Sequence, residues 1–269
     1  NVWYVSRNNI IGGIMEVYYT ICFFIFGLVF GSFFNVVGYR LPLKMSLISP
    51  SSHCPKCNHK LSSSELIPVF SYLIQGGKCK NCKNKIPVFY PIFETITGVL
   101  FALTYIVYGF SIDTIISLVF VSLILILILS DVLYMVVPNI LLTGLTILII
   151  KIIFNGISIL PITLLNMIIP FTVLLIFKLL GDFIFKKESL GNGDINLMLI
   201  FGMVLGWQVS LFTIVLASFL GLFASLITKK LKDNHELPFV PYLGISALIA
   251  LFTKMDASTI EKMLNFFGI

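Results

Sequence analysis

The sequence predicts an all-α polytopic membrane protein of about eight transmembrane helices with a small cytoplasmic loop domain. Hydrophobic residues make up 58% of its 269 residues and charged residues only 11%, and the mean hydropathy is +1.04. Such a composition leaves too little polar surface for a soluble globular protein. Several apolar runs of the length that crosses a bilayer also follow one another along the chain.

Each predicted transmembrane helix is one of these apolar runs. A hydrocarbon core about 30 Å thick needs roughly 20 apolar residues per helix. The third run is the clearest, because its only charged residue before the far end is Asp113, at its outer edge. The second, sixth and eighth runs are short, so their bounds are the least defined. The eight predicted spans are 16–38, 91–110, 112–131, 138–155, 161–183, 194–207, 209–228 and 239–253.

The two ends of the chain differ from the apolar runs between them. Met15 would make a natural start, so we base no functional inference on residues 1–14. At the other end, charged residues such as Lys254 and Glu261 stand among apolar ones, which is typical of a helix that lies on a membrane surface. The predicted parts are an amino-terminal segment with the first helix (1–38), the cytoplasmic loop domain (39–90), a transmembrane domain (91–253) and an amphipathic carboxy-terminal segment (254–269).

The basic residues predict the orientation, because loops rich in Lys and Arg stay on the cytoplasmic side. With the amino terminus outside, the inner side holds most of the 18 Lys and Arg residues. The net charge of +6 therefore follows from topology and from contact with anionic membrane lipid, and we expect no nucleic-acid partner. The inner set is Arg40, Lys44, Lys56, Lys60, Lys78, Lys80, Lys83, Lys85, Lys178, Lys186, Lys187, Lys229, Lys230 and Lys232, and the outer set is Arg7, Lys151, Lys254 and Lys262.

Two aspartates at the ends of apolar runs are the candidates for chemistry. Asp131 ends the third predicted span and Asp194 opens the sixth, and the topology places both on the inner side. Ionisable groups at membrane depth are costly and usually functional. Structural explanations also exist: Asp194 suits a helix N-cap, and Asp131 suits the solvated end of a helix. The flanking Gly191 and Gly193 favour function, because glycine lets a substrate peptide approach closely.

A pair of nearby aspartates suits hydrolysis without a covalent intermediate. The two carboxylates cannot readily both ionise, so they share a proton while one activates water and the other polarises a carbonyl. A proton-coupled transporter would also place acids at membrane edges, but its relay would more often run through the membrane depth. A third possibility is a non-enzymatic, metal-bearing assembly scaffold in which the acids are dispensable.

Two C-x-x-C motifs in the long loop predict a zinc site. The motifs are 21 residues apart, and each supplies two thiolates of a tetrahedral site with no open position, so the zinc is structural. Metal binding would fold a loop with little apolar content. Disulfides are the alternative, which the cytoplasmic side disfavours. His53 or His59 could replace one thiolate. The predicted ligands are Cys54, Cys57, Cys79 and Cys82.

Several motifs resemble type IV prepilin peptidases, and they occur in the family's order from about residue 27 to 244. The first resembles the family's amino-terminal half and precedes the two cysteine motifs. The set comprises Gly31-Ser32-Phe33-Phe34-Asn35-Val36-Val37-Gly38-Tyr39-Arg40-Leu41-Pro42, Leu66-Ile67-Pro68-Val69-Phe70-Ser71-Tyr72-Leu73, Tyr90-Pro91-Ile92-Phe93-Glu94, Asp131 to Pro138-Asn139, Gly191 to Asp194 and Leu237-Pro238-Phe239-Val240-Pro241-Tyr242.

The resemblance implies a bacterial inner-membrane aspartic endopeptidase whose catalytic pair falls on Asp131 and Asp194. Such enzymes cut the leader from prepilins or pseudopilins on the cytoplasmic side, and many then methylate the new amino terminus with S-adenosylmethionine. The four cysteines match the family's metal-binding loop. The S-adenosylmethionine site stays unassigned, because no glycine-rich strand-to-helix motif is present.

Other family positions keep both functional and structural interpretations. Gly31, Asn35 and Arg40 suit substrate contact or, equally, helix packing, a hydrogen-bonded polar group and an interfacial anchor. Glu94 suits substrate binding, helix pairing or a plain interfacial position. Many family members carry Lys where this chain has Asn196. If that Lys helps to ionise the second aspartate, its absence should leave the pKa values of the pair higher.

Overall fold

Helices form nearly every apolar run of the chain. The computed structural model describes residues 2–138, 141–186, 190–229 and 238–266. These residues contain no strand, only two isolated β-bridges in the long loop. Lys187, Lys230 and Lys232 of the topology argument, and Asn139 and Leu237 of the family motifs, lie outside the described residues.

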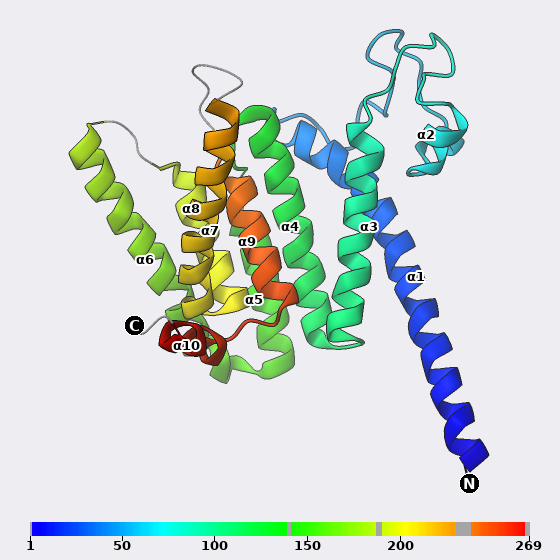
Figure 1. Cartoon of the computed structure of the whole chain (residues 1–269). Coiled ribbons are helices and arrows are strands. Elements are labelled where there is room, and N and C mark those ends of the chain that lie inside the picture. Colours follow the sequence, from blue (N-terminus) through cyan, green and yellow to red (C-terminus); the bar gives the residue numbers. More distant parts are fainter. Residues whose placement is uncertain (1, 139–140, 187–189, 230–237, 267–269) are drawn as a thin grey trace. The chain divides into compact units, whose positions relative to one another are not determined.

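The chain divides into two compact units, Asn1–Thr114 and Ile115–Ile269, which we call unit 1 and unit 2. Unit 1 holds α1 (Val2–Arg40), η1 (Ser63–Leu66), α2 (Phe70–Ile74) and α3 (Phe89–Tyr108). Unit 2 holds nearly all of α4 (Ile112–Tyr134) and then α5 (Leu141–Asn155), η2 (Ile157–Ile159), α6 (Leu160–Phe185), α7 (Asn192–Leu205), α8 (Trp207–Lys229), α9 (Val240–Phe252) and α10 (Ala257–Phe266) (Figure 1).

A helix occupies each of the eight predicted spans, but the number of membrane crossings is not confirmed. Among the described residues, five helices are long and apolar enough to cross a bilayer by length and composition, namely α1, α3, α4, α6 and α8. A sixth span results if α9 and α10, which bend by 103° at their junction, count as one. The described parts of α5 and α7 are shorter apolar helices. The protein is therefore a multi-pass membrane protein with five or six spans by these criteria.

In unit 1, small residues let α1 and α3 approach closely. A Cβ added to Gly27 would lie 2.7 Å from Cα of Gly98, and one added to Gly31 would lie 2.9 Å from Cα of Glu94. Without a hydrophobic driving force in lipid, such close backbone packing is a main source of helix association. Gly31 therefore has the packing role that the sequence left as one of two interpretations.

In unit 2, a proline and a glycine bring α6 and α7 together. Pro170 lies inside α6 and has no N–H, so it cannot bond the carbonyl of Asn166 one turn earlier. Gly202 of α7 covers that carbonyl, because a Cβ at Gly202 would lie only 2.0 Å from the Asn166 oxygen. The freed carbonyl thus faces a neighbouring helix, as expected for a proline within a transmembrane helix.

The described part of the carboxy-terminal segment contains the helix α10. Asp256 begins it, because its carboxylate accepts the N–H of Thr259 at 2.8 Å and lies just before α10. An acidic side chain here satisfies a free N–H of the first helical turn. The 103° bend separates α10 from the axis of α9.

The first prediction concerns the contact of Gly202. In Gly202→Ala, the new methyl group must push α6 and α7 apart, which we expect to cost about 1–3 kcal/mol and to lower the melting temperature in detergent. Gly221→Ala is the control, because its Cβ would lie 3.5 Å from the nearest atom, on Tyr242. Equal melting temperatures for the two variants would contradict this packing.

Candidate active site and metal site

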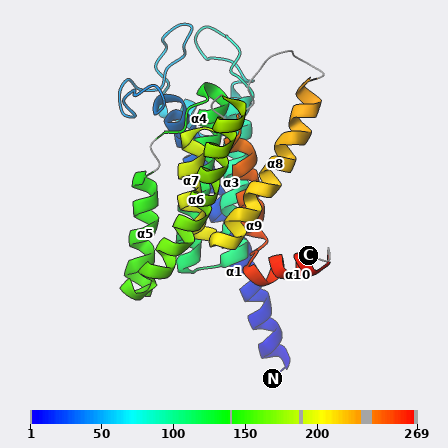
Figure 2. The ribbon, with the colours of Figure 1, turned by 90° about the vertical axis from the view of Figure 1, so that its left-hand side faces the viewer.

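The end of α4 and the starts of α7 and α9 lie at the same end of unit 2 (Figures 1 and 2). Asp131 is in the last turns of α4 and is 6% exposed, and Asp194 is in the first turn of α7 and is 8% exposed. The two carboxylates are close enough for the charge of Asp131 to act on Asp194. The tertiary structure thus brings together two acids that are 63 positions apart in the sequence.

Asp131 is held by the backbone of a third helix. Its Oδ2 accepts the N–H of Val240, the first residue of α9, at 3.1 Å. That N–H has no partner within its own helix, so the carboxylate satisfies it. Asp131 is therefore not the solvated helix end that the sequence offered as an alternative.

Asp194 accepts a hydrogen bond from a backbone N–H at the start of its own helix. The N-cap of α7 is Gly191, and the N–H of Gly191 bonds the Asp194 carboxylate. Asp194 itself is at the third helical position, so it supplies the reciprocal bond of a capping box rather than the N-cap. The positive end of the helix dipole also favours a negative charge there.

The two glycines differ in their surroundings. Gly191 is exposed. Gly193 is approached by its own chain, because a Cβ there would lie 2.4 Å from Cβ of Val137, in the segment after α4. Ser130 anchors that segment by donating its hydroxyl to the carbonyl of Val136. In this structure, Val137 therefore takes the close approach that glycine permits at Gly193.

Lys178 adds a cation to the same region. It lies on α6, is 8% exposed and donates from Nζ to Oδ1 of Asn192 at 2.7 Å. Its charge also acts on Asp194, which it favours in the ionised form. From the sequence alone, Lys178 is only one of the inner-side charges. A lysine within a transmembrane run was the signal that could have identified it.

The four cysteines of unit 1 come together in the predicted arrangement. All four Sγ atoms lie within 4.8 Å of one another. Cys54 and Cys82 are 3.8 Å apart and Cys57 and Cys79 are 3.9 Å apart. These distances are too long for disulfides and match the sulfur separation of about 3.8 Å in a tetrahedral site with metal–sulfur bonds of about 2.3 Å. The group can hold a metal ion.

Two matching turns position these thiols. In each, the residue four positions after the first cysteine has positive φ and donates its N–H to the carbonyl of that cysteine: Asn58 to Cys54 at 2.9 Å and Lys83 to Cys79 at 3.0 Å. The backbone N–H groups of Lys56 and then Cys57 lower the pKa of the Cys54 thiol. Such N–H groups stabilise thiolates, the form that binds metal.

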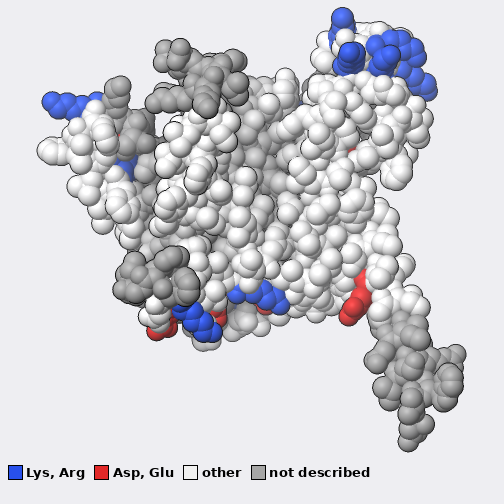
Figure 3. Space-filling model, viewed as in Figure 1, with Lys and Arg blue, Asp and Glu red and all other residues white. Residues whose placement is uncertain are grey.

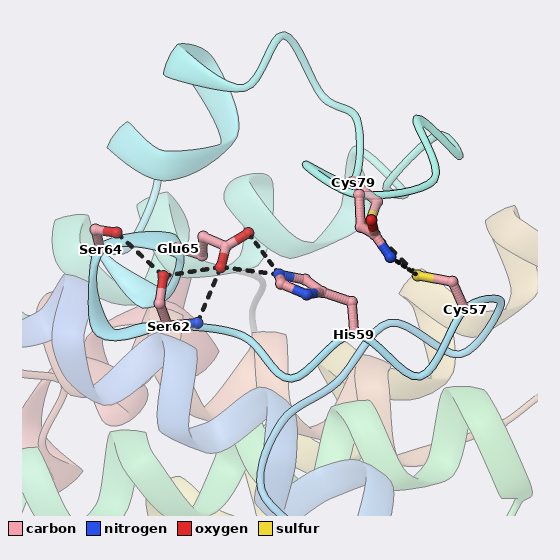
Figure 4. A network of polar contacts seen from close by, with 7 residues as sticks. Cys57, His59, Ser62, Ser64, Glu65 and Cys79 are labelled. Carbon is pink, nitrogen blue, oxygen red and sulfur yellow. Dashed lines mark hydrogen bonds and ion pairs between the residues drawn. The ribbon is translucent and has the colours of Figure 1, made fainter.

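His59 has a different role from a metal ligand. Its Nε2 lies 3.2 Å from a carboxylate oxygen of Glu65, and Glu65 also accepts the N–H and the hydroxyl of Ser62 at 3.0 and 2.8 Å (Figure 4). The four cysteines complete the cluster without it. His59 thus links one cysteine turn to the start of η1. Around this loop, exposed lysines form a basic surface (Figure 3).

Three family positions in unit 1 now have observed surroundings. Arg40 donates to the carbonyls of Ser46 and Pro50 at 3.0 and 2.7 Å, so it shapes the start of the long loop. Glu94 is buried and accepts the N–H of Val69 at 2.8 Å. Asn35 is 6% exposed, and its amide has no hydrogen-bond partner among the described residues.

Comparisons with known proteins identify the family of this chain. Residues 25–108 match the model of the bacterial peptidase A24 N-terminal domain, and residues 118–226 match that of the type IV leader peptidase family. The prepilin leader peptidase/N-methyltransferase of Bacillus subtilis (strain 168) is 34% identical over 232 residues, which cover 84% of this chain and 91% of the relative. The chain belongs to the type IV leader peptidase family.

Further relatives in this leader peptidase family have the same description. Those of Pseudomonas aeruginosa and Neisseria gonorrhoeae are 31% and 30% identical, and each alignment covers 87% of this chain and 90% of the relative. No solved structure matches the chain. The two matched segments fall one in each compact unit. The transporter and scaffold alternatives are not favoured by these findings.

The second prediction concerns Glu65. The N–H and then the hydroxyl of Ser62, with a smaller contribution from His59, lower the pKa of Glu65 from 4.5 to about 2. Because the folded-state pKa is depressed, the carboxylate adds stability above about pH 4.5, and this stability is lost as the pH falls from there towards 2. Glu65→Gln lacks this contribution. We therefore expect the loop of wild type to resist protease better than that of Glu65→Gln above pH 4.5. The two proteins should become equally susceptible in acid.

Loss of metal in acid affects wild type and Glu65→Gln through the same cysteines. It therefore does not contribute to the difference in protease resistance between them. The exposed Glu261→Gln serves as control and should match wild type at every pH. A difference between wild type and Glu65→Gln that persists unchanged to pH 2 would contradict the role of Glu65.

Proposed function

We propose that this chain cleaves the leader peptide from type IV prepilins or pseudopilins and that Asp131 and Asp194 perform the cleavage. One observation carries the assignment of residues. Two buried carboxylates from separate helices lie within electrostatic range of each other at one end of unit 2. Relatives named prepilin leader peptidase/N-methyltransferase supply the substrate class.

In the proposed mechanism, the two aspartates share one proton. The ionised carboxylate removes a proton from water, and the resulting hydroxide attacks the scissile carbonyl carbon. The protonated carboxyl group donates a hydrogen bond to the carbonyl oxygen, where negative charge develops. The bond from Val240 to Asp131 and the bond from Gly191 to Asp194 fix the two side chains for these steps. Collapse of the intermediate then expels the amine with a proton from the pair.

The exposed Gly191 is the proposed point of contact with the substrate backbone, together with Gly193. Since Val137 now packs on Gly193, a peptide reaches Gly193 only when the segment after α4 moves aside. We propose that the apolar helix of the substrate stays in lipid while its leader stays in the cytoplasm. We propose a cytoplasmic position for both aspartates, as the distribution of basic residues predicts, and a place in the bacterial inner membrane, as the family resemblance implies.

We propose that the four-cysteine group binds zinc in a structural role, because four thiolates leave no open coordination position. In this division, 39–90 is the metal-binding loop domain and 91–253 carries the peptidase. We also propose methylation of the new amino terminus, with S-adenosylmethionine supplying the methyl group. The described residues contain no strand, so they lack a strand-to-helix glycine turn, and we assign the methyl donor no residues.

The third prediction tests the aspartates. Asp131→Asn and Asp194→Asn each remove a carboxylate that must carry or accept the shared proton, so we expect cleavage to fall about a thousand-fold or more. The measurement is the gel shift of a purified prepilin incubated with the enzyme in detergent.

Asp113→Asn is the matched control, because Asp113 lies in the first turn of the same helix that ends near Asp131. It should cleave like wild type. Unchanged cleavage by either Asp131→Asn or Asp194→Asn would overturn the proposed pair. Product mass, measured with and without S-adenosylmethionine, tests whether a methyl group is added.

The fourth prediction tests zinc. Purified wild type should hold about one zinc ion per chain, and Cys54→Ser should lose it together with the protease resistance of the loop. Cys22→Ser is the control, because Cys22 is an exposed cysteine of α1 outside the cluster. Full metal content in Cys54→Ser would rule out a site that uses all four thiolates.

A further inference from the structure

In the part of the chain that the structure describes, one cation acts on Asp194. The helices packed on α7 are α5, α6, α8 and α9. On α5 the charged residue is Lys151, which donates to the carbonyl of Met203 towards the opposite end of α7. The described side chains of α8 and α9 include no charged group. On α6, Lys178 is the cation whose charge acts on Asp194.

Lys178 is held in place by bonds that suit this role. Its Nζ donates to Oδ1 of Asn192, which is two residues before Asp194. Asp182 lies one turn further along α6, on the same face as Lys178. A buried lysine costs free energy unless anions or acceptors surround it. Among the described acids, Asp194 is one on which the charge of Lys178 acts, so it offsets part of that cost.

The position of Asn196 points to the same residue. Asn196 is exposed, and it lies about 200° around α7 from Asp194 at 3.6 residues per turn. A lysine at 196 would therefore leave α7 from nearly the opposite face. Residue 196 therefore does not lie beside the Asp194 carboxylate, and Lys178 is the described cation whose charge acts there.

We propose that Lys178 is a positioning residue that sets the charge state of the Asp131–Asp194 pair. The nearby ammonium group stabilises negative charge on the pair, so one carboxylate stays ionised in a buried site while the other keeps its proton. Because the two acids titrate together, the effect applies to both titrations of the pair rather than to one residue. This role rests on the proposed peptidase function.

The charge of Lys178 has a measurable consequence for the pH dependence of cleavage. A bell-shaped profile of kcat/KM reports the two titrations of the pair in the free enzyme. A nearby cation moves both titrations of the pair to lower pH, typically by about one pH unit or more. Removal of the charge should therefore move both limbs of the profile to higher pH. Loss of a merely structural contact would lower the whole curve without moving it.

The test compares Lys178→Gln, which keeps a donor for Asn192 but no charge, with Lys178→Arg, which keeps the charge. We expect both limbs to move up by about one pH unit in Lys178→Gln and to stay within a few tenths of a unit of wild type in Lys178→Arg. Lys151→Met is the matched control, because it removes another lysine bonded to α7, and its limbs should not move.

Asn192→Ala tests the same role without changing the buried lysine. It removes the acceptor at the exposed start of α7, so the ammonium loses its fixed position, and both limbs should shift in the same direction by a smaller amount. Limbs at their wild-type positions in both Lys178→Gln and Asn192→Ala would overturn the proposal, as would unmoved limbs in Asn192→Ala if Lys178→Gln does not fold. A wild-type protein that does not cleave, or an active Asp194→Asn, would instead refute the proposed function.

Discussion

A buried carboxylate needs hydrogen-bond donors, and in this protein backbone N–H groups at chain turns provide them. Asp131 accepts from Val240, Asp194 from Gly191 and Glu94 from Val69. In each case, the acid satisfies an N–H at a turn or a helix start, where no carbonyl of the same helix is available. The bond therefore lowers the cost of burying each acid, and for Asp131 and Glu94 it also joins separate segments of the chain.

The candidate active site depends on this constraint. The bond from α9 fixes the Asp131 side chain, and the first turn of α7 fixes that of Asp194. Close packing between helices supports both, as at Gly202, where α7 lies directly on the Asn166 carbonyl that Pro170 leaves free. Rigid helix ends thus hold two carboxyl groups near each other. The two groups would repel each other if both were ionised.

The loop that carries the four cysteines is built on a different principle. It has little apolar content, and two equivalent turns, His59 with Glu65 and Arg40 with nearby carbonyls give it shape. The Cys-x-x-Cys spacing was sufficient to predict the cluster, because each pair of ligands lies on one local turn. The partners of Arg40 and His59 were not predictable, since a hydrogen bond to a backbone carbonyl or a carboxylate leaves no periodic pattern in the sequence.

The sequence by itself determined the class of protein, the location of the long apolar helices, the four clustered cysteines and the two candidate aspartates. These features follow from local composition and from spacing along the chain. Apolar content determines which segments enter the membrane, and the spacing of cysteines determines whether they can surround one metal ion. Only the tertiary structure decided that Val240 holds Asp131, that Val137 covers Gly193 and that Lys178 provides the charge near Asp194. Those contacts join residues far apart in the chain, and helix packing, which depends on all side chains at once, determines which of them meet.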